Sequence, residues 1–122
     1  MNAVEQILAV QPFMVLDGAF GSELALRGFD TNDALWSARA LVDAPDLVKA
    51  VHRDYYAAGA DVCTSASYQA TIEGFVRKGL TPQEAAGLIA RSVELLKEVR
   101  NEFIALRSSQ NLPSPLAAAS IS

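Results

Sequence analysis

A single carboxylate followed by glycines is the first group in the sequence that could do chemistry. Asp17 ends the short apolar run of residues 14–16 and precedes Gly18 and Gly21. Such a run is typical of a buried strand in a parallel sheet, and parallel α/β folds bind ligands at the carboxyl ends of their strands. The glycines let the backbone approach a ligand, and a helix starting near Phe20 would point free N–H groups toward Asp17. These groups suit an amino acid, whose ammonium would meet Asp17 and whose carboxylate would meet the N–H groups.

A second group of polar side chains follows the next predicted strand, residues 60–67. It comprises Thr64, Ser65, Ser67, Tyr68, Gln69 and Thr71. A strand, a crossover helix and a second parallel strand form a right-handed βαβ unit in nearly all proteins, so both strands end at the same edge. We therefore expect Asp17 and this group to face one site. The alternative left open is that Asp17 only caps the helix that follows it.

The sequence contains one cysteine and one histidine. Cys63 lies inside the second predicted strand, and we interpret it as a small buried apolar residue. One cysteine cannot form an intrachain disulfide, and it is too few for a structural zinc site, which takes four ligands. His52 lies near the edge of a helical apolar stripe. We interpret it as a helix histidine whose polar atoms have partners, not as a catalytic group.

The elements that must position these groups alternate between strands and helices. Three strands are expected, at residues 14–16, 60–67 and 116–122. Helices are expected at residues 3–10, 22–27, 43–58, 71–78 and 81–106. This alternation indicates an α/β fold with parallel strands, ordered in space as along the chain, and crossover helices.

Side chains mark the starts of the two longer helices. Asp43 is the expected N-cap of the helix at residues 43–58, with Pro45 in its first turn. Thr81 and Glu84 match a capping box, and their helix should be the longest element. The stretch 29–37 is rich in turn formers, so we expect it to be irregular, with the side chain of Trp36 packed beneath it. The apolar stripe of the first helix comprises Leu47, Val48, Val51, Tyr55 and Ala58, and that of the second comprises Ala85, Ile89, Val93, Leu96, Val99 and Phe103.

Composition narrows the class of protein. The 122 residues suit one domain, and the net charge of −4 without a Lys/Arg cluster argues against nucleic acid or an anionic membrane as partner. No apolar run approaches the roughly 18 residues of a membrane span, and the start lacks the features of a signal peptide, so we expect a cytoplasmic protein. A hydrophobic content of 51% is high for this size and indicates unusual burial.

Four segments, in this order and at these spacings, resemble the homocysteine S-methyltransferase family. They are Asp-Gly-Ala-Phe-Gly-Ser-Glu-Leu at residues 17–24, Leu-Trp-Ser at 35–37, His-Arg-Asp-Tyr-Tyr-Ala-Ala-Gly-Ala-Asp at 52–61 and Thr-Ser-Ala-Ser-Tyr-Gln-Ala-Thr at 64–71. The resemblance runs from Phe13 to the end of the chain. It implies a TIM (β/α)₈ barrel that moves a methyl group from S-methylmethionine, S-adenosylmethionine or betaine to the thiol of homocysteine. The last segment looks most like the branch that uses S-methylmethionine or S-adenosylmethionine.

The resemblance also implies roles for individual residues. Asp17 would hold the homocysteine ammonium, and the Gly18 and Ala19 amides its carboxylate. Tyr68 and Gln69 would line the pocket near the methyl donor. In the family, a zinc ion held by three cysteine thiolates from later strands binds the homocysteine sulfur. None of those cysteines is present here, so we expect the chain alone to bind no zinc and to transfer no methyl group.

A complete barrel needs about 250 residues. We therefore expect residues 1–122 to be a single α/β segment that corresponds to the N-terminal part of such a barrel, with the barrel incomplete. Its outer strands would leave open sheet edges without protecting charges, which favour self-association. Sedimentation equilibrium of the chain at micromolar concentration tests this expectation.

Two other functions stay open. A non-catalytic α/β module could use the same strand ends to bind a small amino acid or could pair with a complementary chain. Cysteine-bearing sequence downstream of Ser122 would favour the methyltransferase instead. A nucleotide-binding domain is disfavoured, because the turn from Gly18 to Gly21 lacks the GxGxxG spacing and no acidic residue follows a second strand in the expected way.

Overall fold

The computed structural model describes residues 2–31, 36–65, 72–77 and 79–118. Their elements are, in chain order, α1 (Ala3–Leu8), α2 (Phe20–Leu26), α3 (Trp36–Asp43), α4 (Pro45–Ala57), β1 (Val62–Thr64), α5 (Ile72–Arg77), α6 (Pro82–Ser109) and β2 (Leu116–Ala118). The two strands are parallel, with helices between them. The predicted α/β class with crossover helices is therefore confirmed.

β1 is the centre of a small parallel sheet. On one side it pairs with β2. On the other side Leu16 forms a parallel bridge with Val62, and the Asp17 N–H donates to the Val62 carbonyl at 3.0 Å. The predicted order of the three strands is confirmed, although residues 14–16 contribute one bridge and not a full strand. Residues 119–122, the end of the third predicted strand, lie outside the described residues.

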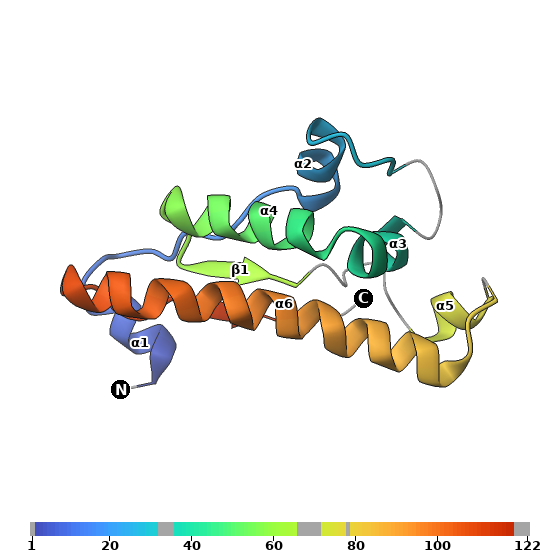
Figure 1. Cartoon of the computed structure of the whole chain (residues 1–122). Helices are drawn as coiled ribbons and strands as arrows, with labels where there is room; N and C mark the ends of the chain where they lie inside the picture. The colour runs from blue at the N-terminus through green and yellow to red at the C-terminus, as the bar shows by residue number, and fades with distance from the viewer. Residues whose placement is uncertain (1, 32–35, 66–71, 78, 119–122) are drawn as a thin grey trace.

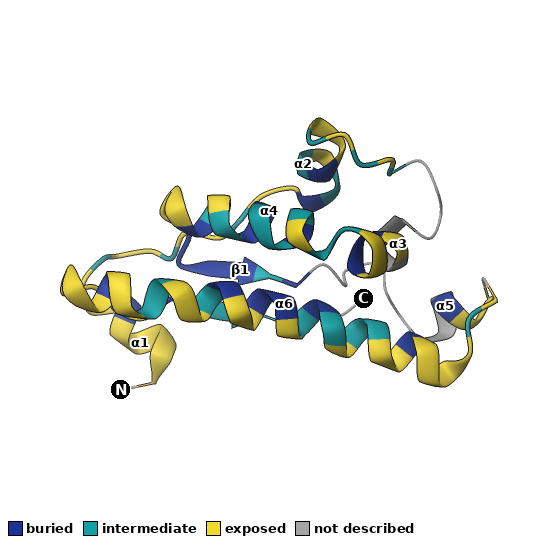
Figure 2. Ribbon diagram, in the orientation of Figure 1, coloured by how far each residue is buried: buried dark blue, intermediate teal, exposed yellow. Residues whose placement is uncertain are grey.

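Two helices supply most of the covering for this sheet. α4 and α6 lie side by side along β1 (Figure 1). Their inward faces are buried and their outward faces exposed (Figure 2). Val51 of α4 belongs to one core cluster, and Val99 of α6 packs with Cys63 of β1 in a second. Burial of apolar surface contributes roughly 25 cal/mol per Å², so these faces provide much of the stability of the fold.

α6 begins where its capping box predicts. The Thr81 hydroxyl accepts the Glu84 N–H at 3.1 Å, and the Glu84 carboxylate accepts the Thr81 N–H at 3.2 Å. With 28 residues it is the longest described element, as predicted. Its buried face was predicted only in part. Of the expected stripe, Ala85, Leu96 and Val99 are buried, whereas Ile89, Val93 and Phe103 are partly exposed and Ser92, Leu95 and Arg107 complete the face. The reason is that α6 contacts α3, α4, α5 and β2 in turn, so different neighbours select its buried positions.

The predicted burial of the first strand is wrong. Val15 is 40% exposed and Leu16 is 65% exposed. A strand of a closed parallel sheet is covered on both faces and has two strand neighbours. Within the described part of the chain, this segment pairs only with β1, which leaves its side chains facing solvent.

One helix was not predicted, and it changes the next helix start. α3 begins at Trp36, inside the stretch expected to be irregular, and ends at Asp43. Asp43 is therefore not the N-cap of α4. Ala44 occupies that position, without a side-chain hydrogen bond. Pro45 opens α4 as predicted, since its fixed φ suits a first helical turn. The side chain of Trp36 lies outside the described residues, so its packing stays a prediction.

Candidate functional site

Asp17 lies beside the carboxyl end of β1. One carboxylate oxygen accepts the Thr64 backbone N–H at 2.9 Å, and the other accepts the Thr64 hydroxyl at 3.2 Å. Both donors are neutral. Asp17 forms no ion pair with any lysine or arginine that the structure describes. β1 therefore fixes the position of this carboxylate without supplying a counter-charge.

The alternative role of Asp17 as a helix cap is wrong. α2 begins at Phe20, and its N-cap residue is Ala19. No side-chain hydrogen bond caps this helix. The carboxylate instead faces Thr64, which the sequence identified only as a polar residue at a strand end. Its paired donation to Asp17 depends on the register between two distant segments, which no local pattern reveals.

A cavity of about 360 Å³ lies beside the turn that follows Asp17. It is lined by Gly18, Ala19, Phe20, Gly21, Ser22, Thr64 and Ser65. One wall is the turn after Asp17, and the other is the end of β1. Residues from both strand ends therefore line one cavity. Asp17 itself is not among its lining residues, and its part in a binding site stays a prediction. The volume lies within the range of small-molecule pockets.

Tyr55 of α4 holds the same turn from another side. Its hydroxyl donates to the Ala19 carbonyl oxygen at 2.8 Å. The sequence placed Tyr55 in an apolar stripe, because helical periodicity registers the aromatic ring and not the hydroxyl. The predicted site residues Tyr68 and Gln69, together with Ser67 and Thr71, lie outside the described residues. Their proposed place near the methyl donor stays a prediction.

The amino end of β1 carries a second aspartate in a different setting. Asp61 is 5% exposed. It accepts hydrogen bonds from the Arg107 guanidinium at 2.8 Å, the Gln11 amide at 2.7 Å and the Val15 N–H at 2.8 Å. Burial by itself would raise the pKa of Asp61, but these three donors lower it. This carboxylate is neutralised within the fold and has a structural role.

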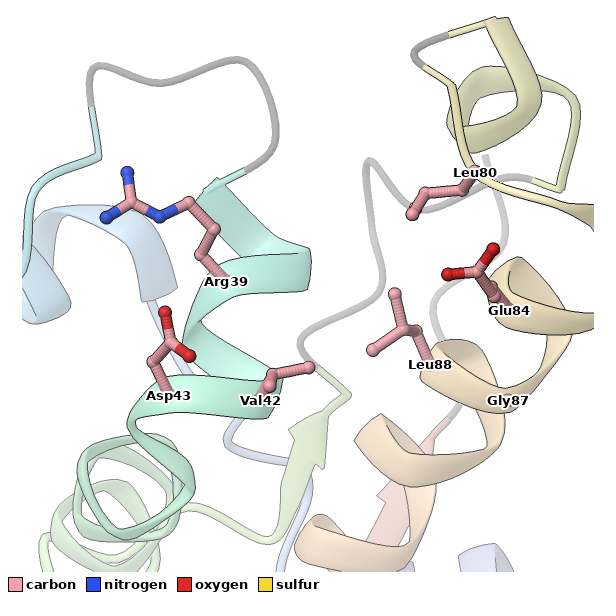
Figure 3. A pocket seen from close by; sticks show the side chains of 7 residues that line it. All are labelled: Arg39, Val42, Asp43, Leu80, Glu84, Gly87 and Leu88. Carbon is pink, nitrogen blue, oxygen red and sulfur yellow. The ribbon is translucent and has the colours of Figure 1, made fainter.

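A cavity of about 450 Å³, larger than the one beside the Gly18 turn, lies away from both Asp17 and Asp61. α3 and the start of α6 form its walls, and Val42 and Leu88 point toward each other across it (Figure 3). Its carboxylates, Asp43 and Glu84, lie on separate helices. No strand end contributes to it, so the smaller cavity beside the Gly18 turn is the better candidate for a site that binds a polar ligand.

The sequence matches the homocysteine S-methyltransferase family over residues 14–122. This chain belongs to that family.

Individual members agree with the family match. The homocysteine S-methyltransferase YbgG of Bacillus subtilis is 49% identical over 122 residues, which cover 99% of this chain and 39% of YbgG. Homocysteine S-methyltransferase of Escherichia coli is 44% identical over 104 residues, 85% of this chain and 34% of that protein. The crystal structure of the metallated homocysteine methyltransferase MmuM from Escherichia coli matches with a TM-score of 0.89 and 40% identity, covering 99% of this chain and 41% of MmuM. The chain thus spans about two fifths of the length of YbgG and MmuM.

The described residues of this family member do not fit a zinc site. The thiol of Cys63 is buried and donates to the His52 carbonyl oxygen at 3.9 Å. Burial raises the pKa of Cys63 to about 12, and a protonated thiol is not the thiolate that zinc binds. Within the described ranges, no three His, Cys, Asp or Glu side chains come together. The interpretation of Cys63 as a buried apolar residue is confirmed, and the absence of zinc from the isolated chain stays a prediction.

His52 differs from its prediction. It is fully buried, its ring lies against Phe20 with centroids 5.1 Å apart, and neither ring nitrogen has a hydrogen-bond partner in the described structure. Burial lowers the pKa of His52 to about 4, so the ring is neutral at pH 7. The expectation that its polar atoms have partners is therefore wrong.

None of the helices formed by the described residues has the length and apolar character that a bilayer span requires.

Proposed function

We propose that this chain carries the homocysteine-binding part of a zinc-dependent homocysteine S-methyltransferase. In this proposal residues 1–122 are the N-terminal segment of a (β/α)₈ barrel, and residues 14–16, β1 and β2 are its first three strands. The parallel order of these segments and the TM-score of 0.89 to MmuM support this assignment.

Asp17 is the observation that carries the proposal. An α-amino acid presents an ammonium group, and a fixed carboxylate without a counter-charge, next to a turn that lines a cavity, is the complementary receptor. Asp17 would bind the ammonium of homocysteine, and the backbone N–H groups of Gly18 and Ala19 would bind its carboxylate. Thr64 orients Asp17 through the two hydrogen bonds described above.

The proposed reaction moves one methyl group between two sulfur atoms. The homocysteine sulfur attacks the methyl carbon of S-methylmethionine or S-adenosylmethionine, and a new carbon–sulfur bond forms. The methyl–sulfonium bond of the donor breaks, its electron pair stays on the donor sulfur, and the thiol proton is released to solvent. The products are methionine and the demethylated thioether. Tyr68 and Gln69 are proposed to line the donor side of the site.

Thiol activation is the part that this chain's described residues do not supply. Zinc makes a bound thiol more acidic and therefore nucleophilic at neutral pH. Cys63 is enclosed and protonated, and it is the single cysteine of the sequence. Other cysteine residues would have to hold that ion.

Calorimetric titration of the chain with L-homocysteine tests the proposed receptor. We expect the wild-type chain to bind, and Asp17→Asn, which keeps the shape but removes the charge, to bind on the order of 10- to 100-fold more weakly. Asp46→Asn removes the same charge from an exposed position in the first turn of α4 and should leave the affinity unchanged. Equal affinities for the wild type and Asp17→Asn would contradict the proposal.

A binding module without catalysis is the second candidate function. The enclosed Cys63 favours it for the isolated chain. An assay with zinc, S-methylmethionine and homocysteine separates the two functions, since a module binds homocysteine and forms no methionine even when a cysteine-bearing C-terminal segment of the family is joined to it.

A further inference from the structure

A hydrogen bond from Tyr55, which is not one of the predicted site residues, helps to fix the turn of the proposed amino-acid receptor. Tyr55 and Ala19 are 36 residues apart in sequence, yet the Tyr55 hydroxyl donates to the Ala19 carbonyl at 2.8 Å. The segment around Asp17 is thus fixed at three points. The other two are the Asp17 N–H bound to the Val62 carbonyl at 3.0 Å and the Asp17 carboxylate bound to Thr64. The Gly18 and Ala19 amides lie between these fixed points.

The shape of the turn matches the Tyr55 phenol. A Cβ atom at Gly18 would lie 2.9 Å from the Tyr55 hydroxyl oxygen and 3.3 Å from Cε1 of the same ring. Gly18 does not have a positive φ, unlike Gly59, so its backbone conformation does not require glycine. The close approach of Tyr55 does require it. The phenol occupies the space that a side chain at position 18 would fill.

The ring that carries this hydroxyl is itself held in place. Tyr55 packs against both core clusters, one containing Val51 and the other containing Cys63. Burial raises the pKa of the Tyr55 hydroxyl, and the nearby carboxylates of Glu23 and Asp17 raise it further. The hydroxyl is therefore protonated at neutral pH and acts as a donor toward Ala19.

We propose that Tyr55 is a positioning residue for the amino-acid receptor, which it assists by fixing the Gly18–Ala19 turn relative to the Asp17 carboxylate. This inference rests on the proposed function, because the turn matters for binding only if homocysteine binds there. A receptor held in its binding geometry before the ligand arrives loses less conformational freedom on binding, and this improves affinity.

The neighbouring tyrosine provides a matched control. Tyr56 is buried, and its hydroxyl donates to the Leu116 carbonyl at 2.7 Å, on β2 and away from the turn. Both tyrosines lie in α4. Tyr55→Phe and Tyr56→Phe each remove one hydrogen bond from a hydroxyl group to a backbone carbonyl oxygen. A purely structural role would make both substitutions act on stability alone, whereas a positioning role separates their effects on binding.

The test measures three quantities for the wild type and both variants. They are the L-homocysteine dissociation constant, the urea midpoint, and the ¹³C resonance of the Ala19 carbonyl in the free chain. We expect Tyr55→Phe to weaken binding about two- to tenfold and to shift the Ala19 resonance upfield. Tyr56→Phe should lower the urea midpoint at least as much as Tyr55→Phe does. It should leave the homocysteine affinity and the Ala19 resonance unchanged.

A second variant checks the same contact without removing it. Gly18→Ala should weaken homocysteine binding in the wild-type chain, because the new methyl group displaces the phenol or the turn. In the Tyr55→Phe background the hydroxyl oxygen is gone and the nearest ring atom lies at 3.3 Å, so the loss of affinity should be smaller.

The outcomes distinguish the two proposals. A wild-type chain that binds no homocysteine overturns the proposed function, and the role of Tyr55 with it. A wild type that binds, together with a Tyr55→Phe variant whose affinity is unchanged, overturns the role of Tyr55 alone. Equal losses of affinity in Tyr55→Phe and Tyr56→Phe would also overturn it, because they would indicate a general effect on stability.

Discussion

An aspartate lies at each end of β1, and the environments of the two carboxylates are opposite in character. At the amino end, Asp61 is buried and accepts hydrogen bonds from Arg107, Gln11 and Val15. At the carboxyl end, Asp17 is half-buried, and two neutral groups of Thr64 hold it. The same side chain is neutralised by the fold at one end and kept available for a cation at the other.

The difference follows from what surrounds each carboxylate. Arg107 near the end of α6 reaches Asp61 with one nitrogen and the Ala60 carbonyl with another. A buried carboxylate needs such a partner, because an unpaired buried charge is costly. Asp17 is only partly buried, and its neighbour Gly18 and its hydrogen-bond partner Thr64 line a cavity of about 360 Å³. We therefore expect the amino end to contribute mainly to stability, and the carboxyl end to the proposed binding of a ligand.

Substitution of Arg107 should remove its ion pair with Asp61 at the amino end of β1 and have the largest effect on the free energy of unfolding. Arg107→Leu leaves Asp61 buried without its cation, and we expect a loss of about 3–5 kcal/mol in the free energy of unfolding. Arg53→Leu is the control, since the Arg53–Glu102 ion pair is exposed and should contribute less than about 1 kcal/mol. Urea unfolding measures both. A loss for Arg107→Leu no larger than for Arg53→Leu would show that the amino end is not the stabilising one.

Acid should lower the stability of the fold through His52, a buried residue of α4. The pKa of His52 is lowered from 6.5 to about 4 by burial, so the unfolded chain binds a proton more readily than the folded one between these values. Stability from this group is complete above about pH 6.5 and is lost as the pH falls toward 4. From about pH 7.5 to about pH 5 we expect the free energy of unfolding to fall by about 2 kcal/mol.

The variant His52→Leu identifies the group responsible. It cannot titrate, so its free energy of unfolding should stay nearly constant over the same interval. Asp61 and Glu102 have lowered pKa values, so they affect stability at more acidic pH and do not interfere. The same slope in His52→Leu and in the wild type would exclude His52 as the cause.

Local signals in the sequence predicted the parts of the fold that local interactions decide. Thr81 and Glu84 fix the start of α6 through hydrogen bonds within one turn. The position of Asp17 after an apolar run, together with the handedness of βαβ units, placed it at the carboxyl edge of the sheet, where the structure has it. Asp43 shows the limit of a local signal. Aspartate is a common N-cap residue, but Asp43 is the last residue of α3 and does not cap α4.

Contacts between distant residues could not be predicted. Arg107 and Asp61 are 46 residues apart, and nothing in either neighbourhood indicates their ion pair. The partnership of Tyr55 with the Gly18 turn depends in the same way on how α4 packs. The exposure of Leu16 depends on which elements cover it, which an apolar run does not specify.

The most direct test of the receptor at the carboxyl end changes the ligand as well as the protein. 4-Mercaptobutanoate has the thiol and carboxylate of homocysteine but lacks the ammonium group. We expect the wild-type chain to bind it about tenfold more weakly than L-homocysteine, and Asp17→Asn to bind both ligands with similar, weak affinity, because the lost interaction is the one between the ammonium and Asp17. A penalty for Asp17→Asn that is the same for both ligands would show that Asp17 acts on the structure of the site and does not bind the ammonium.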